Sequence, residues 1–250
     1  EEKYFQLSRT IIQQAKPHLL VWPESALPVW LRLPVSYGIA KDLQHFVKEQ
    51  NVYLLTGILD FKETPEQFYN AAVLLTPEGH MASWYHKRQL VPFGEFLPYR
   101  SIFTSIPGLS QVVQKMNILG HDTLKGDNPG VIQTPFGKMG PLICFESVYP
   151  HVSRESVLAG AEVLLVITND GWYKDAMAVY QHNAQSVLRA IENDRFVVRS
   201  ANTGVSSIID NRGHILQHTP VLQATSLAGM VYPIQTMTLY AQWGEWIVYL

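Results

Sequence analysis

The chain has 250 residues, of which 47% are hydrophobic and 16% charged, and its formal net charge is −2. The large apolar share excludes a disordered chain, and the near-neutral charge without a long basic run argues against a nucleic-acid-binding protein. A single cysteine excludes an intrachain disulfide, and no run of 18 apolar residues is present to cross a membrane by itself.

Short apolar runs, rich in Val, Ile and Leu and bounded by Gly, Pro, Asn or Asp, predict strands along most of the chain. They lie at residues 18–22, 52–59, 71–75, 140–144, 162–168, 195–200, 205–210 and 214–218. Several runs are apolar at nearly every position, which is typical of strands that are covered on both faces. The last three follow each other closely, so we expect local antiparallel pairing there and a mixed sheet.

Helical patterns separate some of these strands. They cover residues 2–16, 38–50, 151–159 and 178–193. In the last of them, one face carries the apolar residues Ala184, Val187, Leu188 and Ile191, as in an amphipathic helix that packs on a sheet. Alternating strands and helices predict an α/β layered fold.

One segment, residues 92–120, interrupts this alternation. It contains three prolines and many scattered bulky apolar residues, among them Phe93 and Phe96. A long irregular segment in a compact domain is usually functional, and its apolar side chains predict a lid or arm that meets an apolar partner. Residues 243–250 also become apolar, which predicts either a terminal strand or the start of a longer hydrophobic segment.

Cys144 is the first candidate for chemistry. It ends the strand predicted at 140–144, where open α/β folds place their sites, and a turn toward a helix follows it. A thiol near a helix N-terminus gains thiolate character and reactivity. The alternative is a buried, inert side chain, because unpaired cysteines are among the most buried residues.

Two charged motifs precede the cysteine. In "VWPESALP" a strand runs into Glu24, a partly desolvated carboxylate that suits a general base, although it is equally suited to a loop contact. In "WYHKRQLVPFGEFLP", Lys87 could stabilise an oxyanion with Glu95 fixing its position, or it could belong to a solvated charged turn.

The remaining signals are weaker. The nine histidines show no metal-ligand spacing, and we expect His86 and His182 to support a site or to lie at the surface. No G-x-S-x-G, P-loop or G-x-G-x-x-G motif occurs. "TNDGWY" at 168–173 follows a strand and is first of all a turn signal, although it could shape the rim of a pocket.

In this order, the Glu, Lys and Cys motifs resemble the nitrilase, or carbon–nitrogen hydrolase, superfamily. The resemblance runs from about Leu19 to Gly229 and includes "TNDGW", "RAIEND" and "RSANTGVSSIID". The "VWPESALP", "HKRQLVPFGEFLP" and "ICFES" motifs are more specifically similar to those of the apolipoprotein N-acyltransferases, a bacterial inner-membrane family within it.

This resemblance implies a single αββα sandwich domain over residues 1–250, with mixed sheets and no metal or other cofactor. It implies a general base at Glu24, an oxyanion-stabilising Lys87 and a Cys144 nucleophile. Glu95, Phe145 and Glu146 would support the site, and the Phe145 backbone N–H would be a second oxyanion donor. As substrate contacts we expect four aromatic residues: Trp22, Phe93, Phe96 and Trp172.

The implied reaction moves an acyl chain from a phospholipid, through a Cys thioester, to the N-terminal amine of an S-diacylglyceryl-cysteine lipoprotein. The domain would lie on the periplasmic side of the inner membrane, without the membrane helices of the family, and residues 243–250 would lead into one. Two alternatives remain: a soluble nitrilase-type amidase with the same triad, and a non-enzymatic lipid- or peptide-binding module.

Overall fold

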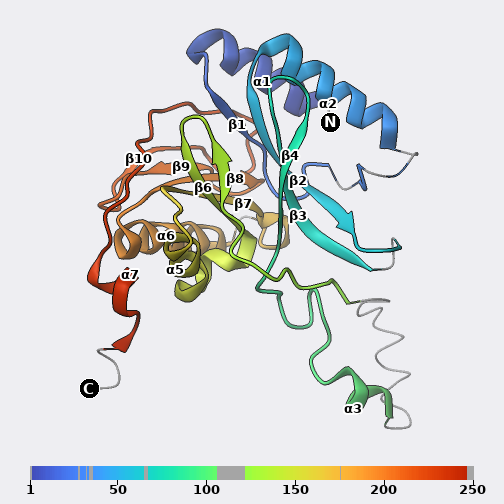
Figure 1. The fold of residues 1–250 in the computed structure, drawn as a ribbon, viewed down its shortest axis with the longest axis vertical. Helices are drawn as coiled ribbons and strands as arrows, with labels where there is room; N and C mark the ends of the chain where they lie inside the picture. The colour runs from blue at the N-terminus through green and yellow to red at the C-terminus, as the bar shows by residue number, and fades with distance from the viewer. Residues whose placement is uncertain are drawn as a thin grey trace.

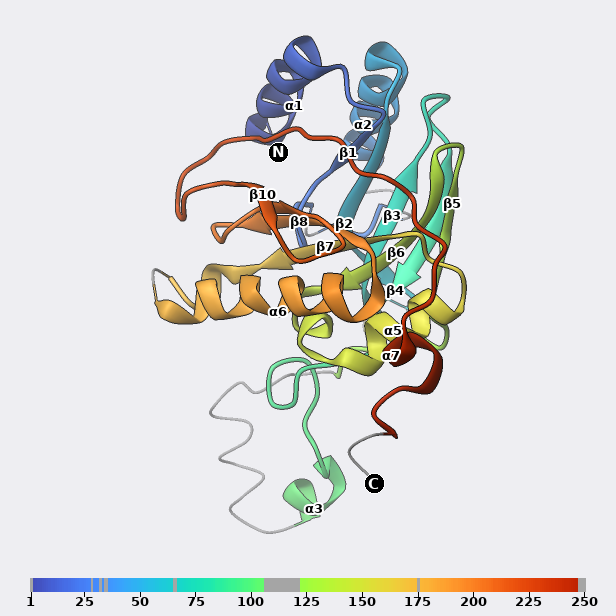
Figure 2. The same ribbon diagram turned by 90° about the vertical axis from the view of Figure 1, so that its left-hand side faces the viewer.

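The computed structural model describes residues 2–27, 29–31, 33, 36–64, 67–105, 122–174 and 176–246. Two β-sheets lie face to face and each is covered by helices on its outer side, which gives four layers (Figure 1). Figure 2 shows α1 and α2 over one sheet, and α5 and α6 over the other. The predicted αββα sandwich with mixed sheets is therefore confirmed.

The first sheet has four strands in the order β1-β2-β3-β4. They are β1 (Leu19–Val21), β2 (Tyr53–Phe61), β3 (Phe68–Leu75) and β4 (Met81–His86). The β1 and β2 strands are parallel, whereas β3 is antiparallel to both β2 and β4. The helices that cover this sheet are α1 (Glu2–Ala15) and α2 (Tyr37–Gln50).

The second sheet has six strands in the order β10-β9-β8-β7-β6-β5. They are β5 (Ile132–Thr134), β6 (Gly137–Ile143), β7 (Val163–Asn169), β8 (Phe196–Asn202), β9 (Ser207–Ile209) and β10 (Ile215–His218). The central β6, β7 and β8 are parallel, and the outer strands pair antiparallel, as the spacing of the last three predicted. The covering helices are α5 (Pro150–Leu158) and α6 (Met177–Asn193).

Strand β7 explains why its sequence is apolar at almost every position. Val163, Leu165 and Ile167 point into the core between the two sheets, while Leu164 and Val166 pack under the helices. Alternate residues of a strand point to opposite faces, so a strand buried on both sides needs apolar residues throughout. Burying each such side chain stabilises the fold by about 1.5–3 kcal/mol.

The sequence missed two strands. The β4 strand is the sequence "MASWYH", and β5 is only three residues long. Neither carries the dense apolar run on which the strand prediction relied. The predicted strand 140–144 also ends one residue earlier, at Ile143, because Cys144 leaves the extended conformation.

Helix α6 packs through a different face from the one that its apolar residues indicated. Leu188 and Ile191 are 46% and 50% exposed, and Ala184 is exposed as well. The buried positions are mostly polar: His182, Asn183, Ser186, Arg189 and Asn193. This face meets the turn after β6, whose carbonyl groups need donors, so hydrogen bonding replaces apolar packing there.

The arm predicted at 92–120 is described only in part. Residues 92–105 end in the short helix α3 (Arg100–Ser105), which Figure 1 shows well away from the four layers. Residues 106–120 lie outside the described part of the chain, as do 247–250 after α7 (Leu239–Trp243). Within the described residues, every helix is too short or too polar to cross a membrane.

The unusual packing of α6 makes a testable prediction. We expect Arg189→Met to lower the free energy of unfolding by about 2–4 kcal/mol, because the buried guanidinium donates to the Ser147 and Val148 carbonyls. Leu188→Ser on the same helix should change it by less than about 0.5 kcal/mol. Urea unfolding of both variants checks this, and a larger loss for Leu188→Ser would contradict the packing.

Candidate active site

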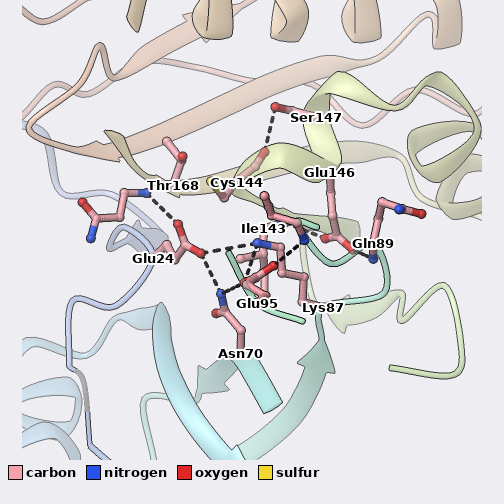
Figure 3. A network of polar contacts seen from close by, with 12 residues as sticks. Glu24, Asn70, Lys87, Gln89, Glu95, Ile143, Cys144, Glu146, Ser147 and Thr168 are labelled. Carbon is pink, nitrogen blue, oxygen red and sulfur yellow. Dashed lines mark hydrogen bonds and ion pairs between the residues drawn. The ribbon is translucent and has the colours of Figure 1, made fainter. Parts of the chain in front are cut away.

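Three candidate residues come shortly after strands that end close together. Lys87 directly follows β4, Cys144 directly follows β6, and Glu24 lies three residues after the end of β1. Because β1 and β4 run in the same direction, their carboxyl ends share one edge of the first sheet. Figure 3 shows the side chains of Glu24 and Lys87 directed toward each other, with Cys144 close by. The topology thus gathers residues that are 63 and 57 positions apart in the sequence.

The carboxylate of Glu24 is buried and held at both oxygens. The Asn169 backbone N–H donates to Oε2 at 2.7 Å, and Asn70 Nδ2 donates to Oε1 at 2.7 Å. The turn that carries Glu24 passes closely over Gly57, where an added Cβ would lie 2.7 Å from the Glu24 Cα. Only glycine allows the backbones to approach this closely, so β2 fixes the position of the carboxylate.

The ammonium group of Lys87 is fully buried between two carboxylates. Its Nζ lies 2.9 Å from Oε1 of Glu95 and 3.7 Å from Oε1 of Glu24. Burial alone lowers the pKa of Lys87, but the two carboxylates outweigh it, so the pKa is raised and the group stays charged. Glu95 is held in turn by the Val91 N–H at 2.9 Å and by Asn70 Nδ2 at 3.1 Å. A fixed cation in a water-poor site suits the stabilisation of an oxyanion.

Cys144 is the first residue of the 3-10 turn η2 (Cys144–Val148), and its φ is 54°. This left-handed conformation costs a non-glycine residue about 1–2 kcal/mol. Burial, followed by the charge of Glu24, raises the pKa of the Cys144 thiol to about 12, although Lys87 opposes the shift. The thiolate character that we expected from a helix N-terminus is therefore wrong for the resting site. A base has to remove the thiol proton during attack.

The comparisons with known proteins agree with this geometry. A family model described as carbon-nitrogen hydrolase matches residues 1–230. The chain belongs to the carbon-nitrogen hydrolase family. Relatives named apolipoprotein N-acyltransferase include one from Geobacter metallireducens, 36% identical over 97% of this chain and 45% of its own length. Another, from Synechocystis, is 34% identical over 93% of the chain and 42% of its own length. The chain thus spans less than half of these relatives.

Solved structures of carbon-nitrogen hydrolase type share the fold. An amidase from Nesterenkonia has a TM-score of 0.69 at 17% identity, covering 99% of this chain and 88% of its own. A carbon-nitrogen hydrolase from Helicobacter pylori has a TM-score of 0.67 at 17% identity, covering 87% of this chain and 79% of its own. At this level of identity, the likeness concerns the fold alone.

In this carbon-nitrogen hydrolase chain, Glu146 holds the turn beneath Cys144. Its buried carboxylate accepts hydrogen bonds from the backbone N–H groups of Ile143, Arg88 and Gln89 at 2.7, 2.7 and 3.0 Å. The hydroxyl of Tyr85 donates to it at 2.8 Å. Burial raises the pKa of Glu146, and the backbone donors oppose that shift. Figure 3 shows how one carboxylate links the Cys144 turn to the strand end that carries Lys87.

Sequence reasoning missed the residue that joins the two carboxylates of this family site. Asn70 in β3 donates to both Glu24 and Glu95. The signal that could have found it is an amide placed just before the apolar run "AAVLL". His182, which we expected either to support a site or to lie at the surface, is buried next to the Cys144 turn, in agreement with the first alternative. No group of side chains in the described residues has the composition and spacing of a metal site.

The four aromatic candidates separate into two kinds. Trp22 is buried in the core under α1, where its Nε1 donates to Ser8 at 2.9 Å. It also borders a cavity of about 830 Å³ that includes neither Lys87 nor Cys144, so its position is that of a packing residue and not of a substrate contact.

The other three aromatic candidates reach the surface near the strand ends. Phe93 is 59% exposed and Trp172 is 87% exposed, whereas Phe96 is half-buried. Trp172 ends the short turn η3 (Asp170–Trp172), directly after β7. Phe145 is half-buried beside the nucleophile position and packs edge-on against Tyr149.

The pKa of the Cys144 thiol gives a prediction about its reactivity. In the wild type, alkylation by iodoacetamide should keep rising with pH up to about pH 11, because the thiol pKa is about 12. Glu24→Gln removes the negative charge that helps to raise this pKa, so the rise of alkylation with pH should shift to lower pH. The exposed Glu49→Gln serves as a control and should leave the pH profile unchanged. A profile in Glu24→Gln that stays in place or moves to higher pH would contradict the assigned charge coupling.

The role of Glu146 gives a prediction about stability. Glu146→Gln places an amide N–H group among four donors, so we expect a loss of about 2–4 kcal/mol in the free energy of unfolding. Glu155→Gln is a matched control at a half-exposed carboxylate that pairs with Arg88, and it should cost less than about 1 kcal/mol. Calorimetry measures the stability of both variants. Equal losses in the free energy of unfolding would contradict the role of the Glu146 carboxylate in holding the Cys144 turn.

Proposed function

We propose that this chain is the catalytic domain of a phospholipid-dependent N-acyltransferase that acylates the N-terminus of diacylglyceryl lipoproteins. The observation that carries the proposal is the sharing of the buried Lys87 by Glu24 and Glu95 next to Cys144. The proposal is also supported by relatives that are 30–36% identical to this chain and are named apolipoprotein N-acyltransferase. The reaction uses protein groups only and needs no cofactor.

The first half-reaction forms a thioester. Glu24 takes the thiol proton while the sulfur of Cys144 attacks the ester carbonyl of the phospholipid. The Lys87 ammonium and the Phe145 backbone N–H stabilise the oxyanion of the tetrahedral intermediate. As the ester C–O bond breaks, Glu24 returns the proton to the leaving alkoxide, and a lysophospholipid departs. The raised pKa of Cys144 supports this order, because the proton leaves only when the base and the substrate act together.

The second half-reaction transfers the acyl group to an amine. The α-amine of the S-diacylglyceryl-cysteine attacks the thioester carbonyl, and Glu24 accepts the proton that the amine loses. The same two donors stabilise the second oxyanion. The C–N bond forms, the C–S bond breaks and the sulfur recovers its proton from Glu24. The resting site is restored without any change in its net charge.

A lipid substrate also suits the exposed residues around the site. Phe93 and Tyr99 in the described part of the arm, and Trp172 after β7, are large apolar side chains that are more than half exposed. We assign these side chains to contact with lipid at the membrane interface. The domain would act on the periplasmic side of a bacterial inner membrane.

The proposal is tested by trapping the acyl-enzyme. We expect the protein, incubated with phosphatidylethanolamine vesicles, to gain the mass of one acyl group. Since Cys144 is the only cysteine, Cys144→Ala should gain none. The measurement is intact-protein mass spectrometry. Absence of the adduct on the wild type, or an equal adduct on Cys144→Ala, would overturn the proposal. Turnover of a small soluble amide, unaffected by phospholipid, would instead indicate the amidase.

A further inference from the structure

A second buried polar network contacts the backbone of Cys144 through His182. From it we infer that His182, held by Asp170, is a positioning residue that aims the Phe145 backbone N–H at the oxyanion. This inference rests on the proposed acyl transfer at Cys144. It assigns to α6 and η3 a part in catalysis beyond the Glu-Lys-Cys cluster.

One end of the network fixes the histidine ring. His182 Nδ1 lies 2.8 Å from Oδ1 of Asp170, and both side chains are buried. The same carboxylate receives Arg199 Nη2 on its other oxygen at 2.9 Å and the hydroxyl of Thr168 at 3.0 Å. Arg199 Nη2 also lies 3.1 Å from His182 Nδ1. A carboxylate anchored by three side chains sets the orientation of the ring, as an aspartate does for a catalytic histidine.

The other end of the ring reaches the nucleophile's own carbonyl group. His182 Nε2 lies 3.2 Å from the Cys144 carbonyl oxygen and 3.1 Å from the Ser147 hydroxyl. The Ser147 hydroxyl donates to the same carbonyl at 2.9 Å, and Figure 3 shows this bond. Asp170 and the Cys144 carbonyl both accept, so a ring that donates to both carries a proton on each nitrogen. In that form, two side chains from different elements hold one carbonyl group. The carbonyl belongs to Cys144, whose φ is 54°. This strained conformation persists only when the surrounding structure holds it.

Peptide geometry connects this carbonyl to the oxyanion. The Cys144 C=O and the Phe145 N–H belong to one planar trans peptide, so they point in opposite directions. Figure 3 shows the Cys144 carbonyl directed toward Ser147, with Glu24 and Lys87 on the other side, so the N–H of the same peptide turns toward that side. If the carbonyl loses this hold, the peptide plane can rotate, and the N–H no longer faces the oxyanion.

A pair of reactions separates this role from a general structural one. Acylation of Cys144 by a p-nitrophenyl ester passes through an oxyanion, whereas alkylation by iodoacetamide does not. We expect His182→Ala to slow the acylation burst by about 10- to 100-fold, part of the roughly 10²–10³ that loss of a whole oxyanion donor costs. Alkylation should stay within about twofold. Ser147→Ala removes the second hydrogen bond to the carbonyl. It should also lower the ratio of the acylation rate to the alkylation rate.

The matched control is Asn183→Ala. Asn183 is the buried neighbour of His182 on α6, but it binds Ser207 of β9 at 2.8 Å and has no part in holding the Cys144 carbonyl. This variant should lose stability without changing the ratio of acylation to alkylation. Circular dichroism and thermal unfolding verify that each variant is folded. If His182→Ala does not fold, the comparison is made with Ser147→Ala alone.

The outcomes separate this inference from the proposed function. A wild-type protein that is alkylated but never acylated would refute the nucleophile role itself. If the wild type is acylated, and folded His182→Ala and Ser147→Ala keep its ratio of acylation to alkylation, the positioning role is overturned. A parallel fall of both reactions would also overturn it, because a general loss of thiol reactivity does not act through the oxyanion.

Discussion

The buried ammonium group of Lys87 is the interaction on which the site depends. A charge removed from water is costly unless opposite charges and hydrogen bonds surround it, and here Glu24 and Glu95 supply the charges. Both carboxylates need their own partners, which Asn70 and the backbone N–H groups of Val91 and Asn169 provide. Most of these groups come from the first sheet and the segment after β4, and Asn169 at the end of β7 adds a donor from the second sheet. The packing of the two sheets therefore completes the surroundings of the cation.

The Cys144 turn meets this cluster under a separate set of restraints. Glu146 ties the turn to the strand end that bears Lys87, and Ser147 holds the carbonyl group of Cys144 itself. A nucleophile in a left-handed conformation needs such restraints, because nothing in its own backbone preference keeps it there. The result is a buried thiol with a raised pKa beside a fixed carboxylate and a fixed cation. In the proposed mechanism, such a site reacts when a carbonyl substrate arrives.

The catalytic candidates were predictable because their motifs are local in sequence. Glu24 and Cys144 come shortly after apolar strands, and a layered α/β fold brings such strand ends together. Lys87 follows β4, which is not apolar, so only its motif identified it. Asn70 was not predictable, because it acts through contacts between distant elements. The packing of α6 was misjudged for a related reason: its inner face satisfies carbonyl groups, so the apolar residue Leu188 points outward. Trp22 was expected at the substrate because it lies two residues from Glu24, but its side chain packs into the core under α1 and donates to Ser8 there.

The most direct test of acyl transfer is the fate of the acyl group once it is on Cys144. The acylated protein is mixed with increasing amounts of a synthetic S-diacylglyceryl-cysteine peptide, and the amide product and free fatty acid are quantified by mass spectrometry. If the chain is an N-acyltransferase, the acyl group appears on the peptide α-amine in proportion to peptide concentration, with little free fatty acid. Release of the acyl group as free fatty acid at every peptide concentration would contradict this function and identify a hydrolase.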